Sequence, residues 1–399
     1  MTFIPSHRFK RAPVQTGLEL FVEEHLGSYR GKRLGLLANQ ASVDHAYRHA
    51  LELLDSALKD HVKVLFSPQH GWAGEKQDNM VESLDAKTGD GRPIYSLYGE
   101  SRAPTLEMLS EIDALLIDLP DVGTRVYTFA QTMSLCLEVA SKAHIEVVVL
   151  DRPNPISGAE REGNLLDDDC VSFVGFHPIP MRHGLTLGEL ALFVNSRLKD
   201  PAALTIVPVK GWKREMYFND TDLNWVLPSP NLPNPVSAWL YPGQVLWEGT
   251  NVSEARGTTA PFHVVGAPFM KATTIARELE GFKLPGVVFR PTSFQPTFNK
   301  WAGELCQGVQ IHPQDRSYKP LLTSLTILQI VLKLHPDSFR LKDPPYEYEW
   351  NRRPIDLILG RKSIFDDLSV GAAAFDIWRS FAAELGEFER QVKDILLYR

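Results

Sequence analysis

The stretch Ala114-Leu-Leu-Ile-Asp118, followed by the loop Asp121-Val-Gly-Thr-Arg-Val-Tyr127, indicates the fold most directly, because a short apolar run ends abruptly in a polar loop. The pattern recurs at Val62-Lys-Val-Leu-Phe-Ser67, and again at Val147-Val-Val-Leu-Asp151 with its loop Arg152-Pro-Asn-Pro155. Short, β-branched runs separated by helical stretches are typical of buried parallel strands. Ligands of open parallel sheets bind outside the carboxyl ends of the strands, so we expect a candidate site in these loops.

Helical and strand patterns alternate through the amino-terminal half of the chain. The spacing of apolar residues predicts helices at 17–26, 47–58, 127–143 and 186–198, and further strands at 33–39 and 204–209. Thr186 with Glu189 three residues later fits a capping box at the start of the fourth helix. This alternation predicts an α/β fold with a Rossmann-like, mostly parallel sheet and helices on both faces.

The alternation of helix and strand patterns ends after Trp225. The segment Pro228-Ser-Pro-Asn-Leu-Pro-Asn-Pro235 that follows can form neither a helix nor a central strand. A chain of 399 residues exceeds what one core usually organises. We therefore predict a Rossmann-like domain at 1–235 and a smaller α+β domain at 236–399. The second domain is expected to contain strands at 287–290 and 309–312 and helices at 321–334 and 373–396.

The charge of the chain narrows the class of partner. The formal net charge is −7 and no long run of Lys and Arg occurs, which argues against nucleic acid, since phosphate binding needs a clustered basic surface. We expect a small molecule or a neutral polymer as the partner, and no membrane.

The expected compartment follows from two features. Cys136, Cys170 and Cys306 are odd in number and widely spaced, so they are expected to be reduced and structural. The segment 1–11 lacks an apolar core of signal-peptide length, and no apolar stretch is long enough to span a membrane. A cytoplasmic protein is the expectation.

Familiar cofactor and metal motifs are missing from the sequence. No G-x-G-x-x-G follows a strand, and neither the P-loop motif nor H-E-x-x-H, C-x-x-C or G-x-S-x-G occurs. The predicted sheet therefore does not imply a dinucleotide, and we expect no cofactor and no metal.

The loop after the 62–67 run holds four titratable side chains, His70, Glu75, Asp78 and Glu82. Carboxylates in such a loop commonly face water, and His70 could serve a site or only a structural hydrogen bond. In the next loop Asp121, Arg125 and Tyr127 could orient a polar ligand, although a helix cap and a surface ion pair explain them equally well. Asn154 between two prolines could present a fixed amide or simply occupy a rigid turn.

The segment 247–259 is the other dense polar cluster. It contains Glu248, Asn251, Glu254 and Arg256 among glycines and hydroxyl residues, a mixture suited to sugars, whose hydroxyls need paired donors and acceptors. Site roles are favoured for Glu254 and Arg256 over Glu248.

With these residues the chain resembles the NamZ-type exo-β-N-acetylmuramidases, a bacterial glycoside hydrolase family, over nearly its whole length. The matching blocks include His70-Gly71, Ser96-Leu-Tyr-Gly99, 121–128, 150–155, 183–191, 228–233, 248–254 and Arg256-Gly-Thr258. The resemblance implies an active site in a cleft between the two domains. It also implies release of N-acetylmuramic acid from the non-reducing ends of peptidoglycan fragments.

One departure from the family pattern concerns catalysis. The family resemblance implies a glutamate directly before His70-Gly71, whereas this chain has Gln69. An amide cannot move the proton that a glycosidase carboxyl must move, although it could hold the substrate's acetamido group. The catalytic candidates are Glu75, Glu254 and His70. The candidates for substrate binding are Gln69, Asp121, Arg125, Tyr127, Asn154, Asn231, Asn251 and Arg256.

Three functions stay open on the sequence alone. The first is hydrolysis of amino-sugar glycans, with a cytoplasmic enzyme acting on imported cell-wall fragments. The second is a binding or sensing protein that kept the site and lost hydrolysis, with Gln69 as the mark of that loss. The third is a metal-dependent hydrolase that uses His70, Asp78 and Asp121.

Overall fold

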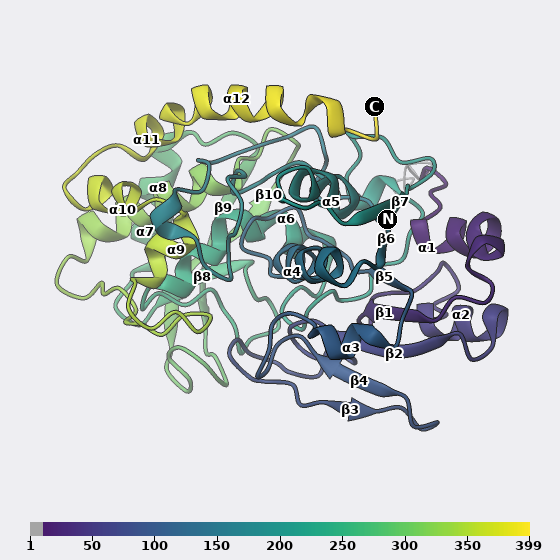
Figure 1. Cartoon of the computed structure of the whole chain (residues 1–399). Coiled ribbons are helices and arrows are strands. Elements are labelled where there is room, and N and C mark those ends of the chain that lie inside the picture. Colours follow the sequence, from purple (N-terminus) through teal and green to yellow (C-terminus); the bar gives the residue numbers. More distant parts are fainter. Residues whose placement is uncertain (1–10) are drawn as a thin grey trace, which may run out of the picture.

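A seven-stranded sheet forms the centre of the amino-terminal half in a computed structural model that describes residues 11–399 (Figure 1). Its strands are β1 (Leu34–Ala38), β2 (Val62–Ser67), β3 (Ala86–Lys87), β4 (Pro93–Ser96), β5 (Ala114–Asp118), β6 (Glu146–Leu150) and β7 (Ala203–Val207). Their order is β3-β4-β2-β1-β5-β6-β7, and only the short edge strand β3 runs antiparallel to its neighbour. The helices of this half are α1 (Gly17–Leu20), α2 (Ala50–Leu58), α3 (Leu106–Ser110), α4 (Phe129–Ala143) and α5 (Leu187–Asn195).

Side-chain alternation along the strands explains why helices cover both faces of this sheet. In β5, Leu115 and Ile117 belong to the apolar cluster that contains α3, α4 and α5, whereas Leu116 belongs to the cluster that contains α1 and α2. Successive side chains of a strand point to opposite faces, so a strand buried on both faces is apolar at every position. The predicted doubly wound α/β fold is confirmed.

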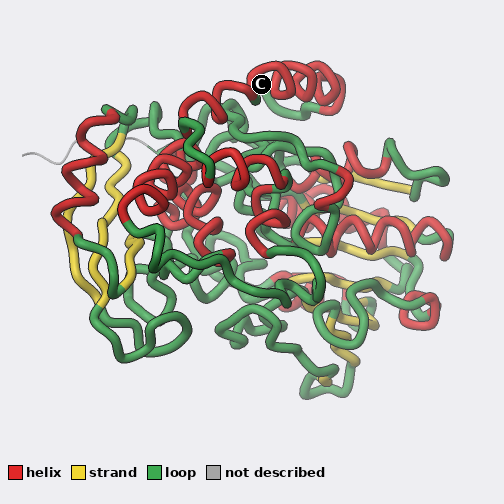
Figure 2. The backbone as a smooth tube through the Cα atoms, turned by 90° about the vertical axis from the view of Figure 1, so that its left-hand side faces the viewer, coloured by secondary structure: helices red, strands yellow, loops and turns green. Residues whose placement is uncertain are grey.

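The carboxyl-terminal half is built on a three-stranded antiparallel sheet, in the order β8-β10-β9. Its elements are α6 (Pro235–Gln244), β8 (Val264–Ala267), α7 (Ala272–Phe282), β9 (Val287–Phe294), β10 (Cys306–Pro313), α8 (Pro320–Leu334), α9 (Pro354–Leu359), α10 (Lys362–Ser369), α11 (Ala374–Ser380) and α12 (Ala382–Val392). Figure 2 shows this small sheet at one end of the molecule and the strands of the large sheet at the other, with helices between them.

The end of the chain returns to the amino-terminal half. Phe388 of α12 packs on Phe193 of α5, with ring centroids 5.8 Å apart, and the Tyr398 hydroxyl donates to Asp151 at the end of β6. One buried apolar cluster also continues from α4 and α5 into α6 and α8. The division at residue 235 stays a prediction.

Most predicted elements are present with shifted ends. The Thr186 capping box is confirmed, since Glu189 N–H donates to the Thr186 hydroxyl and the Glu189 carboxylate accepts from Thr186 N–H. The helix predicted at 373–396 is two helices, α11 and α12, which meet at Phe381. The helix predicted at 17–26 leaves α geometry after Leu20 and continues as π and 3₁₀ turns.

The expectations about cysteines and membranes concern the described part of the chain. All three cysteines are buried and free, as predicted. Within residues 11–399 no helix combines the length and the hydrophobicity needed to cross a bilayer. The expectation that the chain lacks a signal peptide was based on segment 1–11. Residues 1–10 of that segment lie outside the described residues.

Candidate active site

The loop that follows β2 starts the site, because its backbone turns sharply toward the carboxyl-terminal half. His70 and Gly71 have φ values of 74° and 86°, in the left-handed region. This conformation costs free energy for His70, which has a Cβ, so tertiary contacts must hold it there. His70 is buried, and its Nδ1–H donates to the Lys76 carbonyl at 2.6 Å, which closes the loop on itself. Burial lowers the pKa of His70 to about 4, so the imidazole is neutral near pH 7 and its Nε2 can only accept.

Two adjoining hollows lie where this loop meets the segment 248–256. The large pocket has a volume of about 320 Å³ and is lined by Asp78, Asn79, Met80, Glu248, Thr250, Asn251, Glu254, Arg256, Asn299, Lys300, Lys342 and Tyr346. The small recess has a volume of about 20 Å³ and is lined by Gln69, His70, Asn79, Val126, Tyr127, Thr128, Val174, Ser229, Asn231, Tyr241, Arg256, Phe262, Tyr346 and Glu347. Asn79, Arg256 and Tyr346 belong to both, so the hollows share a wall.

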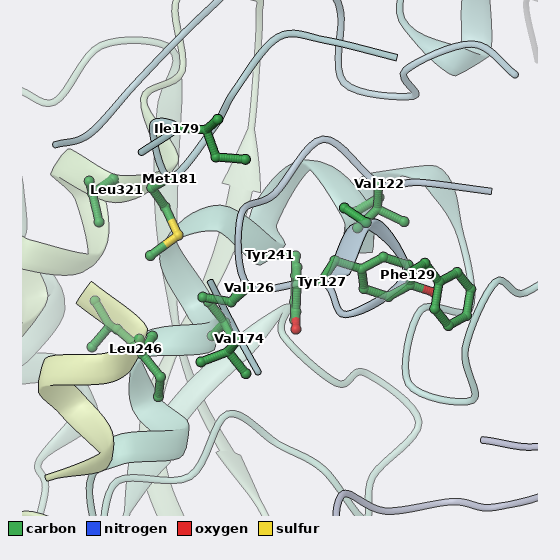
Figure 3. Packing of buried hydrophobic residues seen from close by; sticks show 14 of the residues in the cluster. Val122, Val126, Tyr127, Phe129, Val174, Ile179, Met181, Tyr241, Leu246 and Leu321 are labelled. Carbon is green, nitrogen blue, oxygen red and sulfur yellow. The ribbon is translucent and has the colours of Figure 1, made fainter. Parts of the chain in front are cut away.

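Aromatic and aliphatic side chains form one side of the small recess. Val126, Tyr127, Val174 and Tyr241 pack against each other in the apolar core, and the rings of Tyr127 and Tyr241 meet edge to face with centroids 6.3 Å apart (Figure 3). A recess of about 20 Å³ holds about one water molecule. An apolar wall keeps the dielectric low around the polar groups opposite it, which strengthens their interactions.

A compact cluster of charges forms the floor of the large pocket. The Arg256 guanidinium lies 2.6 Å from Glu248 and 3.3 Å from Glu254, and the Lys300 ammonium lies 2.5 Å from Glu254. Burial opposes ionisation of Glu248, but the charge and hydrogen bond of Arg256, with help from Tyr346 and Lys300, hold its pKa below the ordinary value. Glu248 is therefore a buried carboxylate that stays charged near neutral pH.

A second carboxyl, Glu347, lines the small recess, and the residue is 4% exposed. Its Oε2 accepts from the Tyr98 hydroxyl at 2.6 Å, and its Oε1 accepts from the Gln69 amide at 3.2 Å. Burial and the negative charge of Glu248 outweigh the opposing effects of Tyr98, Gln69 and Arg102, and raise the pKa of Glu347 to about 7. The surroundings of the two carboxyls thus shift their pKa values in opposite directions.

Asn79 and Tyr346 connect the two carboxyls. The Asn79 amide donates to Glu248 at 2.8 Å, and its oxygen accepts from Gln69 at 3.5 Å. The Tyr346 hydroxyl donates to Glu248 at 2.9 Å, and Tyr346 directly precedes Glu347 in the chain. A pair of carboxyls whose surroundings push their pKa values apart is the arrangement expected of an acid and its charged partner.

Comparisons with known proteins decide the family. Residues 34–236 match the model of the amino-terminal part of exo-β-N-acetylmuramidase NamZ, and residues 239–398 match that of its carboxyl-terminal part. The chain belongs to the NamZ family. It is 40% identical over 392 residues to the peptidoglycan β-N-acetylmuramidase NamZ of Bacillus subtilis (strain 168), an alignment that covers 98% of this chain and 92% of the relative.

Two crystal structures of DUF1343 family proteins from Bacteroides fragilis NCTC 9343 share the fold. One is 34% identical with a TM-score of 0.88 and covers 98% of this chain and all (100%) of its own. The other is 27% identical with a TM-score of 0.76 and covers 97% and 99% of the two chains. The predicted family of glycosidases and the predicted fold class are confirmed by these relatives.

Seven of the residues predicted from the sequence of this NamZ relative lie at the two hollows: Gln69, His70, Tyr127, Asn231, Asn251, Glu254 and Arg256. One oxygen of Glu254 pairs with Arg256 and the other with Lys300. Asn251 lines the pocket, but its amide already bonds the backbone of Ser338 and Arg340.

The structure does not bring Arg125 or Asn154 to the hollows. Arg125 is 1% exposed, and its guanidinium donates to backbone carbonyls, among them Asn164 and Leu359 at 2.8 and 2.7 Å. The Asn154 amide donates to the Leu185 carbonyl and accepts from Ile156 N–H. Both side chains hold distant segments together, so the geometry corrects the expectation that they contact substrate.

Asp121 and Glu75 also lie elsewhere. Asp121 accepts from Gly123 N–H, lies 3.2 Å from His183, and lines a separate hollow beside Arg152. Glu75 is exposed and lines neither the large pocket nor the small recess. Across residues 11–399 no three His, Cys, Asp or Glu side chains are grouped as metal ligands, so the site with His70, Asp78 and Asp121 is not formed.

Sequence reasoning missed Glu347, Tyr346 and Asn79, and it ranked Glu248 too low. The available signal was the run Tyr346-Glu-Tyr-Glu-Trp350, in which two glutamates alternate with three aromatic residues. Only Tyr346 and Glu347 of this run are buried, whereas Trp350 is 63% exposed, so the run marks a candidate segment without singling out Glu347.

Proposed function

We propose that this chain is a glycosidase that releases N-acetylmuramic acid from the non-reducing end of peptidoglycan fragments. The observation that carries the proposal is a pair of buried glutamates at adjoining hollows, with Glu248 held charged by Arg256 and Glu347 carrying a raised pKa. Glycosidases need one carboxylic acid and one negative group at the scissile bond. The large pocket, at about 320 Å³, falls in the range of small-ligand sites.

The charges around the large pocket support an acidic sugar. Lys342 lines this pocket and is exposed; its ammonium lies 5.9 Å from the centroid of the Tyr346 ring and forms no ion pair within residues 11–399. Arg256 and Lys300, by contrast, are already engaged by Glu248 and Glu254. N-acetylmuramic acid differs from N-acetylglucosamine by an ether-linked lactyl group that carries a carboxylate, and Lys342 is the cation of the pocket that is available to meet it.

We infer that Gln69 occupies the position where the family resemblance implies a catalytic glutamate. Its amide does not move a proton, but it donates to Glu347 at 3.2 Å and accepts from the Thr128 hydroxyl at 2.5 Å. In this reading Gln69 orients another carboxyl, and its presence does not exclude hydrolysis.

The test is turnover of a 4-nitrophenyl β-N-acetylmuramide and of a disaccharide with a non-reducing N-acetylmuramic acid. We expect both to be cleaved, with the matching N-acetylglucosaminides cleaved about five- to tenfold less efficiently, because the loss of one charge contact at an exposed lysine costs about 1 kcal/mol. Calorimetric binding of the disaccharide without release of product would instead support a sensing protein. Neither binding nor turnover would contradict both readings.

A further inference from the structure

Each carboxyl oxygen of Glu347 accepts a hydrogen bond from an identified donor, Tyr98 or Gln69. The Tyr98 hydroxyl accepts from Met80 N–H at 3.0 Å and from the Gln69 amide at 3.1 Å. Its single proton is therefore left to donate to Glu347 Oε2, at 2.6 Å. Gln69 completes the set with its bond to Glu347 Oε1.

The residues of this hydrogen-bond network come from three segments that are far apart in the sequence. Gln69 belongs to the loop after β2, Tyr98 follows β4, and Glu347 lies between α8 and α9. A buried carboxyl without partners would cost several kcal/mol in any protein, and here two donors, Tyr98 and Gln69, match the two oxygens of Glu347. Glu347 also lines a recess of about 20 Å³ that adjoins the large pocket.

We propose that Glu347 is the acid that protonates the departing glycosidic oxygen, with Gln69 and Tyr98 as its positioning residues. The proposal rests on the proposed glycosidase function and names the group that performs its proton transfer. The family resemblance implies a glutamate that takes part in catalysis at position 69, and in this chain position 69 carries no acid.

Cleavage transfers one proton from Glu347 to the glycosidic oxygen. The bond between the anomeric carbon and the glycosidic oxygen breaks, the oxygen keeps the electron pair, and the proton of Glu347 moves onto it. The leaving sugar departs as an alcohol, and Glu347 becomes a carboxylate. A water molecule then adds its hydroxyl to the anomeric carbon and gives its proton to Glu347, which restores the acid.

The groups that face Glu347 are consistent with a proton donor near neutral pH. Burial and the Glu248 carboxylate favour the protonated form, while Tyr98, Gln69 and Arg102 oppose it, and the resulting pKa is about 7. A donor whose pKa lies near the working pH is efficient, because it holds the proton and still releases it readily. Activity should accordingly fall as the pH rises through about 7.

The experiment compares Glu347→Gln with the wild type on two substrates. The disaccharide leaves as a sugar alcohol and needs the proton, whereas 4-nitrophenolate leaves without one. We expect kcat on the disaccharide to fall about 10²- to 10⁴-fold and kcat on the nitrophenyl glycoside to fall much less. The decline of activity above pH 7 on the disaccharide should disappear in the variant, and the nitrophenyl glycoside should show little decline in either protein.

The matched control is Glu349→Gln, the same change two residues along, where the carboxylate pairs with Arg352 at 2.5 Å and lines neither hollow. This variant should keep both activities and the pH profile. If Glu347→Gln fails to fold, Glu347→Asp retains an acid and should keep the decline above neutral pH at a reduced kcat.

Two outcomes separate the proposals. Wild-type turnover of the disaccharide, with Glu347→Gln within about threefold of it and an unchanged pH profile, would overturn the assignment of Glu347 and leave the glycosidase function standing. Absence of turnover by the wild type on both substrates would overturn the function itself, and the role of Glu347 with it.

Discussion

Replacing Gln69 by glutamate places a second carboxyl beside Glu347 and tests the contact between these positions directly. The Gln69 amide nitrogen lies 3.2 Å from Glu347 Oε1, so a carboxylate oxygen at residue 69 would take nearly the same place. Two carboxylates at that distance cannot both ionise readily, and the pair would share one proton. We expect Gln69→Glu to keep a proton at the site to higher pH than the wild type does.

The size of the effect follows from the distance. Two unit charges 3.2 Å apart repel by about 5 kcal/mol at an effective dielectric constant of about 20, which separates the two ionisations of the pair by about four pKa units. The second ionisation controls the loss of the acid, so the decline in kcat should move from about pH 7 to at least about one unit higher.

The assay is the pH dependence of kcat on the disaccharide between pH 5 and about 10, with stability of each variant checked across the range. Gln77→Glu is the matched control, because Gln77 bonds Asn231 and makes no contact with Glu347. Its profile should coincide with that of the wild type. If Gln69→Glu is fully folded and its kcat declines at the same pH as that of the wild type, residues 69 and 347 do not share a proton and the reasoning is refuted.

Three further changes probe other parts of the site. Lys342→Gln should raise KM for N-acetylmuramides about five- to tenfold and leave that for N-acetylglucosaminides unchanged, as measured by steady-state kinetics, because only the former carry the carboxylate. Arg125→Met should lower the free energy of unfolding by about 3 kcal/mol or more in urea, since it strands buried carbonyls, while activity per folded molecule stays intact. Glu75→Gln should leave kcat and KM unchanged, and a loss of more than tenfold would place this exposed carboxyl back among the catalytic groups.

The central sheet was predictable because its strands are buried on both faces and so appear as uninterrupted apolar runs. β5 shows this directly, as every residue from Ala114 to Asp118 is buried. The edge strand β3 has only two residues, Ala86 and Lys87, both exposed, and its pairing with β4 comes from tertiary contact. Helix α6 was missed because Pro242 lies inside it, and proline normally argues against a helix interior.

The site was predictable only where its residues cluster in the sequence. Glu254 and Arg256 stand two residues apart among other polar groups, and they do line the large pocket. Arg125 stands in an equally suggestive loop, but the carbonyls that occupy its guanidinium belong to residues 164 and 359, which no local pattern connects to it. A side chain's availability depends on distant backbone, and for that reason chemical type alone overestimates substrate contacts.

The segment 346–348 shows how one short stretch can serve both carboxyls. In an extended strand, successive side chains point to opposite sides, so Tyr346 and Glu347 would not reach the same recess. Glu347 and Tyr348 instead have φ values of 47° and 65°, which break that alternation, and both Tyr346 and Glu347 line the small recess. This left-handed backbone costs roughly 1–2 kcal/mol per residue without a glycine, so tertiary contacts must hold it. The bonds from Tyr346 to Glu248 and from Tyr98 to Glu347 are those contacts, and they tie the backbone of this segment to the charge state of the site.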